Sequence, residues 1–595
     1  EHTITEGSNV VGAYRANDNM IIGERNPFLY RNPDDPSALP QVVLPNGGIY
    51  KLEQNNLQSY YLRNALEYNK AFKDQDEQDK HTLKLFLGQE FRYTDRDNQS
   101  FDGYGYQFNR GGVVFTDPRI IEKVIADNAQ YFDRSTGRER GVAFFSQASY
   151  GFRNRYILSG TLNYEGSNQL GRSRKARWLP TWNISGRWNV TNEHFLPTTH
   201  ALSNLSFRLS YGLIAGLNNI GNALPIMVST ITPRFRNQDN ERLIRILSLQ
   251  NSDLTWEKVY ETNFGTDIGF LSNAISLSVD LYQKNSKDLL DIVRTSGMGG
   301  ELNKYANDAS MTTRGVELVL DTRNFKTEDF TWSTSVNFAY FNQEITSLAN
   351  ASNSVFNLVR ETGGNVLGNP RNTLYSYDFA GLNSQGMPLL NLKEGSRDYK
   401  DIDFQDRDNI LSYLKKEGAV DPNITGGLSN TFRYKNWELN FLITMQAGNK
   451  IRKAPLYKGA GYDDLSVFPR EFKNRWVAPG DEALTQIPGI VSQRTLNEEN
   501  KAYISRAYSA YNHSTARVVD GSFVRMKSIS LSYTFDKEVL ENLNIGNLTL
   551  RLQASNPFLI YAHKDLNGQD PEFFRSGGVA YPITPQYTFT INLGI

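Results

Sequence analysis

The strongest constraint on this sequence is a hydrophobic period of two that persists through unusually long segments. One segment carries polar or small residues between the apolar side chains of Leu205, Phe207, Leu209, Tyr211 and Leu213. One face is therefore apolar and the other polar, which is typical of a β-strand with different surroundings on its two faces. A globular strand has about 5–6 residues, whereas many of these segments exceed ten, so they favour tilted strands that cross a membrane, which need about 9–11 residues.

The chain contains fifteen segments of this kind, at 57–72, 80–94, 141–152, 154–164, 178–190, 203–217, 256–270, 273–288, 309–322, 329–345, 424–434, 437–449, 519–535, 546–557 and 586–595. Short gaps (73–79, 153, 191–202, 271–272, 323–328, 435–436, 536–545) alternate with long gaps (95–140, 165–177, 218–255, 289–308, 346–423, 450–518, 558–585). Membrane barrels have short periplasmic turns and long extracellular loops. The alternation predicts an all-β protein, a transmembrane antiparallel β-barrel. The alternative is a large soluble sandwich or solenoid, in which nothing would make short and long loops alternate.

The alternation also fixes the predicted organisation of the chain. Residues 370–392 look extended, but we expect them to form a hairpin inside the loop 346–423. One more wall strand there would move every preceding loop to the opposite side of the membrane. We expect 1–56 to be an extracellular loop region and 57–595 the C-terminal part of the barrel, with 346–423 and 450–518 as long extracellular loops. Fifteen antiparallel strands cannot close on themselves, so part of a larger barrel is the preferred interpretation.

Composition and motifs exclude several classes of function. The 64 basic and 64 acidic residues cancel, which argues against a nucleic-acid partner. The absence of cysteine excludes disulfides and thiolate sites. No apolar run is long enough for a transmembrane helix. The six histidines have no ligand spacing and no hydrolase or nucleotide motif occurs, so we predict that the protein is not an enzyme and has no cofactor.

One acidic stretch in the loop 346–423 is a candidate metal-binding site. Alternating oxygen ligands suit Ca²⁺, and the stretch contains Asp401, Asp403, Asp406 and Asp408. Its spacing is broken by Phe404 and Gln405, and no central glycine is present. We therefore predict a solvated acidic turn, with a calcium loop as the alternative.

Aromatic residues in the long loops are the candidates for contact with cargo or a partner protein. They are Tyr457, Tyr462, Phe468, Trp476, Phe573, Phe574 and Tyr581. Sugar rings and apolar peptide side chains both pack on aromatic faces. The alternative is that these rings pack loop against loop. Polar side chains on the inward face of the strands, such as Arg187, Arg208, Asn183 and Asn337, would contact water or a plug.

Several motifs follow one another from about residue 140 to the end of the chain. They are Trp178-Leu179-Pro180-Thr181-Trp182 with Gly186-Arg187-Trp188, Leu254-Thr255-Trp256-Glu257-Lys258, Asn263-Phe264-Gly265-Thr266-Asp267-Ile268-Gly269-Phe270-Leu271, Asp280-Leu281-Tyr282, Lys287-Asp288-Leu289-Leu290, Gly315-Val316-Glu317-Leu318, Leu374-Tyr375-Ser376-Tyr377, Gly426-Gly427-Leu428, Arg475-Trp476, Asp520-Gly521-Ser522-Phe523-Val524-Arg525-Met526-Lys527, Asn556-Pro557-Phe558 and Asp570-Pro571-Glu572. Together they resemble the C-terminal barrel portion of SusC/RagA-like TonB-dependent transporters of Bacteroidetes-type bacteria.

This resemblance implies a 22-strand barrel in the outer membrane of a Gram-negative bacterium, of which about fifteen strands would be present here while the N-terminal plug would be absent. It implies import of oligosaccharides or oligopeptides, a SusD-like lipoprotein as lid, and energy from TonB, ExbB and ExbD. Lipid and lipopolysaccharide would surround the barrel, and two transporter–lipoprotein pairs could form a dimer. The alternative function is a structural subunit of an outer-membrane assembly without transport.

Overall fold

The structure is a computed structural model, and it describes most of the chain in separate stretches. These are residues 2–6, 29–30, 32, 34–35, 37–39, 41–42, 48–73, 79–106, 118–119, 132–168, 177–196, 201–216, 226–233, 240–248, 254–294, 303–348, 355–392, 395, 410–457, 468–491, 501–541, 545–573 and 583–594. Among them, no helix is both long enough and apolar enough to cross a membrane.

In the described part of the chain, sixteen strands are hydrogen-bonded in one sheet, and its order follows the chain. They are β1 (His2–Glu6), β4 (Gly48–Lys73), β5 (Asp79–Tyr106), β6 (Phe132–Phe152), β7 (Tyr156–Ser167), β8 (Trp178–Asn189), β9 (Leu202–Gly216), β12 (Glu257–Phe270), β13 (Ile275–Arg294), β14 (Asn303–Lys326), β15 (Phe330–Ser347), β20 (Ile424–Tyr434), β21 (Trp437–Ala447), β24 (Phe523–Thr534), β25 (Asn547–Ala562) and β26 (Gln586–Gly594). Each of the fifteen predicted strands has its counterpart here. The sixteenth, β1, lies in the segment 1–56, where the sequence predicts only a loop region.

The shortest of the described connections are tight turns. β6 and β7 are joined through Arg153 and Asn154, whose φ angles are +49° and +51°. Two consecutive residues with positive φ form the hairpin turn whose twist matches that of the flanking strands. A further short connection contains helix α8 (Lys537–Glu541).

The contacts divide the chain into two units. Unit 1 comprises Glu1–Leu66, Leu87–Phe145 and Asn163–Leu170. It also contains a small hairpin of β2 (Leu29–Tyr30) and β3 (Gln41–Val42). Polar side chains link strands within it. Tyr61 Oη of β4 donates to Glu90 of the neighbouring strand β5 at 2.9 Å, and Arg92 of β5 reaches across β6 to pair with Glu165 of β7 at 3.0 Å.

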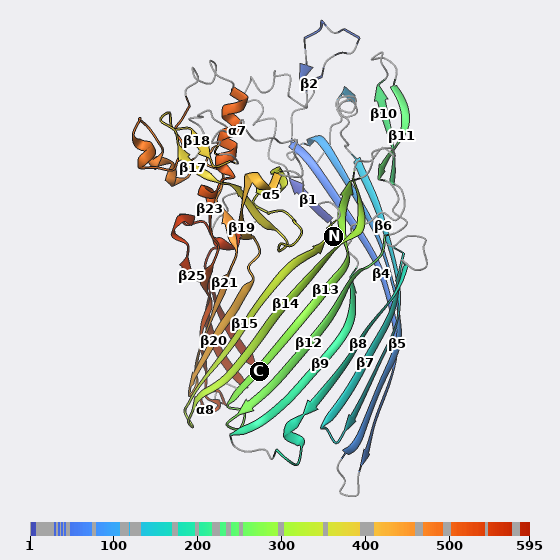
Figure 1. Cartoon of the computed structure of the whole chain (residues 1–595). Helices are drawn as coiled ribbons and strands as arrows, with labels where there is room; N and C mark the ends of the chain where they lie inside the picture. The colour runs from blue at the N-terminus through green and yellow to red at the C-terminus, as the bar shows by residue number, and fades with distance from the viewer. Residues whose placement is uncertain are drawn as a thin grey trace. The chain divides into compact units, whose positions relative to one another are not determined.

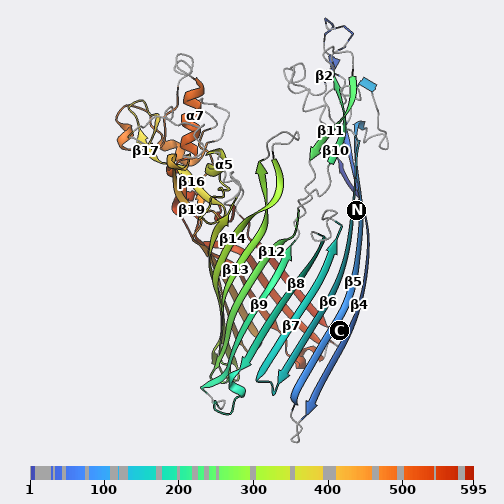
Figure 2. The same cartoon turned by 45° about the vertical axis from the view of Figure 1, so that its right-hand side comes forward.

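Unit 2 comprises Glu67–Phe86, Ser146–Leu162 and Gly171–Ile595. Figure 1 and Figure 2 show strands β9, β12, β13, β14 and β15 of this unit running side by side, with the helices and short strands of the long loops beyond the ends of β20 and β21. Pairing is antiparallel, and registers such as Gly265 opposite Asp280 fix which side chains share a face.

The two faces of the unit 2 sheet differ in the way the sequence predicts. Large apolar side chains remain exposed on one face, including Ile184, Leu209, Phe264, Leu281 and Leu552. Aromatic rings on the same face contact one another across strands, as in the series Trp188–Phe207–Phe264. We call this side the apolar face. The residues between them, such as Arg208 and Asp267, form the polar face.

The predicted hairpin within 370–392 is confirmed as lying outside the main sheet. β17 (Phe379–Leu382) pairs with β18 (Pro388–Leu390), and β16 (Thr373–Tyr377) pairs with β19 (Leu414–Ala419). The prediction of one continuous strand over 519–535 is wrong, because β23 (Val518–Asp520) ends before Gly521 and pairs with β22 (Lys450–Arg452). β10 (Ile226–Pro233) and β11 (Asn240–Ser248) form a separate hairpin within the predicted gap 218–255.

The two longest loops fold together. Helix α5 (Val355–Val359) and helix α7 (Lys501–Asn512) come from different loops. Ala510 of α7 packs in one hydrophobic core with Val355 and Leu358 of α5. We call the described residues 355–392, 410–423, 448–457, 468–491 and 501–522 the loop cluster.

Candidate functional site

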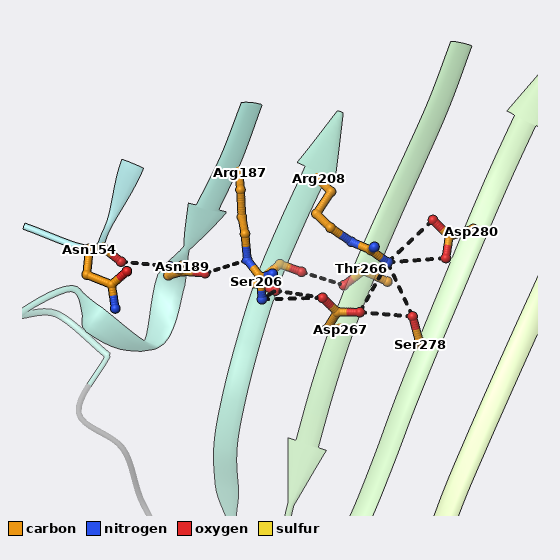
Figure 3. Close-up of polar contacts among 9 residues, drawn as sticks. All are labelled: Asn154, Arg187, Asn189, Ser206, Arg208, Thr266, Asp267, Ser278 and Asp280. Carbon is orange, nitrogen blue, oxygen red and sulfur yellow. Dashed lines mark hydrogen bonds and ion pairs between the residues drawn. The ribbon is translucent and has the colours of Figure 1, made fainter. Parts of the chain in front are cut away.

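The polar face carries a network of charged groups near the short-turn ends of β8, β9, β12 and β13 (Figure 3). Arg187 Nη2 donates to Ser206 Oγ at 3.1 Å and lies 3.5 Å from an Asp267 oxygen. Arg208 Nη2 lies 3.1 Å from Asp267 Oδ1 and 3.2 Å from Asp280 Oδ2. The hydroxyl of Ser278 donates to Asp267 at 2.9 Å. Four strands are thus joined side by side through their polar side chains.

A glycine makes this network possible. Gly265 lies between Arg208 and Asp280 in the register of the sheet. A Cβ atom there would meet Asp280 Oδ1 at 2.5 Å and Arg208 Nη2 at 2.9 Å. The missing side chain therefore lets Arg208 reach across β12 to the carboxylate on β13. Gly265, Asp267 and Asp280 all belong to the sequence motifs.

The chemistry available to this network is limited. Two guanidinium groups face two carboxylates, so the charges balance, and all four side chains are about a quarter to two-fifths exposed. Exposed ion pairs contribute about 0–1 kcal/mol each. The network holds the wall strands in register and offers fixed donors and acceptors on the polar face.

A second motif fastens the other end of β13. Asp288 has a φ of +57° within a bulge of this strand. Lys258 Nζ lies 2.6 Å from the Asp288 carboxylate. Asn307 donates to the backbone oxygens of Asp288 and Thr255 and accepts from Thr255 N. The motifs around Trp256 and Lys287 therefore form one connection between β12, β13 and β14.

The loop cluster has a core of tyrosines. The rings of Tyr457 and Tyr508 meet edge to face at 5.0 Å. Tyr508 Oη donates to Gly489 O at 2.5 Å, and Tyr457 Oη donates to Pro488 O. Burial raises the pKa of Tyr457 and of Tyr508 well above the ordinary value, and it raises the pKa of Tyr511 to about 12. All three hydroxyls are neutral at physiological pH, and those of Tyr457 and Tyr508 act as donors.

Buried Arg452 connects both long loops. It is 5% exposed. Its guanidinium donates to Tyr375 O at 2.7 Å, to Ser376 Oγ at 2.9 Å and to Ser514 O at 3.2 Å. Burial lowers its pKa to about 10, so the group remains a cation. A cation solvated by backbone oxygens from two loops ties those loops into one body.

A second buried arginine strengthens the same body. Arg517, 1% exposed, donates to Glu471 Oε1 at 2.6 Å, and Lys453 lies 2.9 Å from the same carboxylate. Burial alone would raise the pKa of Glu471, but the two cations outweigh it and hold the pKa below its usual value. Glu471 is therefore ionised at neutral pH.

A third buried pair explains two motifs at the end of the chain. Arg525 of β24 donates to Asp570 Oδ1 at 2.5 Å, and the two side chains are only 3% and 1% exposed. Asp570 also accepts from the backbone N–H groups of Glu572 and Ile583. The pair fixes the loop after β25 against the wall.

The described candidate aromatics lie in different environments. Tyr457 is only 4% exposed and packs loop against loop. Trp476 donates to Glu482 at 3.0 Å and lies against Gly386 and Gly489, so it joins the hairpin β17–β18 to residues 468–491. Phe468 stacks on Phe472 at 4.2 Å, and Phe573 is half-buried beside Asp570.

The other candidates lie outside the described residues: Tyr462, Phe574, Tyr581, Asp401, Asp403, Asp406 and Asp408. Within the described part of the chain, no three His, Asp or Glu side chains are grouped to hold a metal ion. Sequence reasoning missed the roles of Arg452, Arg517 and Glu471. Arg525 and Asp570 both belong to the sequence motifs. Their opposite charges in two separate motifs were the signal that could have indicated their pairing.

Comparisons with known proteins agree with this architecture. The family described as "TonB dependent receptor-like, beta-barrel" matches residues 7–556. TonB-dependent receptor P39 of Formosa agariphila is 25% identical over 610 residues, which cover 93% of this chain and 54% of that protein. TonB-dependent receptor SusC of Bacteroides thetaiotaomicron is 25% identical over 520 residues, which cover 84% of this chain and 47% of that protein.

A similar solved structure, that of the RagAB peptide transporter, gives a TM-score of 0.72 at 21% identity and covers 92% of this chain and 56% of that one. The chain spans about half the length of the curated relatives it matches. The resemblance to SusC/RagA-like TonB-dependent transporters is confirmed, and with it the location in the outer membrane of a Gram-negative bacterium. The chain belongs to the TonB-dependent receptor-like β-barrel family.

Proposed function

We propose that this chain forms part of a TonB-dependent importer that takes up oligosaccharides or oligopeptides together with a SusD-like surface lipoprotein. The observation that carries the proposal is the family match along residues 7–556. Two names support it: one relative is TonB-dependent receptor SusC, and one similar structure is described as a peptide transporter. No catalytic step is part of this function.

The complete protein would be a 22-strand barrel with a plug, and this chain would supply its C-terminal strands. The short turns would lie on the periplasmic side, and the loop cluster would lie outside the cell. Residues 1–56 would belong to the external loops. TonB, ExbB and ExbD would supply energy through the plug, and two transporter–lipoprotein pairs would form a dimer.

The loop aromatics would serve two purposes in this importer. Phe468, Phe573 and Trp476 are partly exposed in the structure, and we assign them, with Tyr462, Phe574 and Tyr581, to contact with cargo or the lipoprotein. Tyr457 would hold the loop cluster together. A solvated turn remains the prediction for Asp401 to Asp408, with calcium as the alternative.

The test is growth on defined nutrients. Strains lacking this protein, lacking TonB, or lacking both are grown on a panel of oligosaccharides and oligopeptides and on the corresponding monomers. We expect one oligomer class to fail in all three strains alike, while growth on monomers is unchanged, because monomers pass through porins.

Growth on every oligomer in the strain without this protein would contradict import. Loss of growth that does not depend on TonB would contradict energy coupling. If growth is normal but other outer-membrane proteins no longer copurify as a complex, the alternative of a structural subunit is correct.

A further inference from the structure

The apolar face of unit 2 ends abruptly across four strands. One row of directly paired residues is wholly apolar: Phe264, Leu281, Val316 and Tyr340. The next row toward the long loops on the same face is wholly polar: Thr262, Gln283, Arg314 and Asn342. The change therefore takes place within two residues of each strand, roughly 7 Å along it.

Two cations lie at or beyond this boundary without a carboxylate partner. Arg314 is exposed, and its Nε donates to Gln283 Oε1 at 3.0 Å. Lys287 is exposed, with its ammonium 5.7 Å from the centre of the Tyr260 ring. No carboxylate among the described residues lies within ion-pair distance of either group. Lys258, by contrast, is paired with Asp288, and Glu344 lies one row farther out than Arg314, opposite Thr312.

Cations in this position need an anion. The apolar run of β13 on this face extends only from Ile275 to Leu281, about 20 Å of strand, whereas the apolar band of a membrane barrel is about 25 Å tall. Arg314 therefore lies at the edge of the hydrocarbon, where an uncompensated arginine is costly. The long side chains can turn toward the headgroups and meet phosphate there.

We propose that Arg314 and Lys287 form a site for the phosphate groups of lipopolysaccharide in the outer leaflet. Arg314 binds phosphate through the guanidinium edge that Gln283 leaves free, and Lys287 supplies a point charge above Tyr260. Asn285 of β13, opposite Tyr260, adds an amide donor between them. The site rests on the proposed orientation, with the long loops outside, but not on any transport activity.

The test measures lipid binding to the complete protein, purified from outer membranes in detergent and freed of lipid. Native mass spectrometry follows the titration of lipopolysaccharide, of the same lipopolysaccharide treated with phosphatase, and of phosphatidylglycerol. We expect the double variant Arg314→Gln/Lys287→Gln to bind intact lipopolysaccharide at least about tenfold more weakly, because charge-assisted contacts are lost.

The matched control is Lys284→Gln, on the same strand but on the polar face, where Lys284 lies 3.8 Å from Glu261. We expect this variant to bind as the parent protein does. Arg314→Lys/Lys287→Arg keeps both charges and should retain binding, so it tests the site even if the neutral variant assembles poorly. Equal losses in the control, unchanged binding in the double variant, or equal affinity for phosphatidylglycerol or phosphatase-treated lipid would each overturn the site. None of these outcomes depends on import.

Discussion

At the scale of single residues, the loop cluster depends on arginines in unusual surroundings. Arg452 has no carboxylate within hydrogen-bonding distance among the described residues, and its donors are directed at backbone oxygens of Tyr375 and Ser514. Buried backbone oxygens that lose a donor are left with their full desolvation cost. Arg452 is therefore a structural cation, and its removal leaves buried backbone oxygens of both loops without a donor.

We predict that Arg452→Met destabilises the loop cluster by about 2–4 kcal/mol, since at least two buried oxygens lose their donor. Hydrogen exchange in the complete protein should then accelerate in both 373–377 and 501–512. The control is Arg475→Met, because Arg475 is half-buried and lies 4.8 Å from the Phe472 ring centre; its effect should stay below about 1 kcal/mol. Faster hydrogen exchange in only one of these two segments would contradict the conclusion that Arg452 ties both loops into one body.

At the scale of strands, glycines on the polar face make room for long side chains from the neighbouring strand. Arg208 lies over Gly265, Tyr282 over Gly315, and Asn337 over Gly427. Asn183 lies over Gly212, where the backbone of Trp182 also comes close. A glycine opposite a large side chain keeps that side chain flat against the wall. This repeated pairing accounts for Gly265, Gly315 and Gly427 in the sequence motifs.

The two kinds of glycine contact should respond differently to a methyl group. In Gly212→Ala the Cβ would meet Trp182 O at 2.7 Å, a backbone atom that cannot move alone. In Gly265→Ala it would meet the mobile ends of Asp280 and Arg208. We expect a loss of about 1–3 kcal/mol for Gly212→Ala and less than half of that for Gly265→Ala, measured as the shift in thermal unfolding. Equal shifts in thermal unfolding for the two variants would contradict this difference between the backbone contact and the side-chain contact.

The strands could be predicted from the sequence, but the loop cluster could not. A period of two is a local signal, and it runs from Leu205 to Leu213 in β9 and from Val336 to Tyr340 in β15. The contacts of the loop cluster join residues far apart, such as Arg452 with Tyr375 and Tyr457 with Asn512. No local pattern encodes such pairs, so α7 and β19 were missed, and the packing of Tyr457 between loops was only an open alternative. The break at Gly521 was missed because apolar residues continue the alternation on both sides of it.

At the scale of the molecule, the difference between the two faces of the unit 2 sheet has one physical meaning. A large exposed apolar surface is unfavourable in water and is stable against lipid hydrocarbon. The apolar face carries Leu209, Phe264, Leu281 and Leu552, each more than 40% exposed. The polar face carries charged side chains, such as Arg208, Asp267 and Lys284. Lipid should therefore contact the apolar face alone.

Adjacent residues of β14 test this assignment directly. Leu318 lies on the apolar face, opposite Val279 and Phe338, whereas Val319 lies on the polar face, opposite Ser278 and Asn337. We predict that Leu318→Arg destabilises the membrane-inserted protein by about 2–4 kcal/mol, the cost of arginine facing lipid near the bilayer centre. Val319→Arg should cost less than about 1 kcal/mol, because Glu317 and Asp321 flank it on the same face.

Denaturant titration of the complete protein in lipid vesicles measures both changes, and heat-modified gel mobility reports the assembled fraction in cells. Both substitutions put the same side chain into the same strand, so strand propensity and net charge cancel in the comparison. Only the face differs. Equal costs would mean that water or protein covers both faces at this height, and a larger cost for Val319→Arg would mean that lipid contacts the face that carries Arg208 and Asp267.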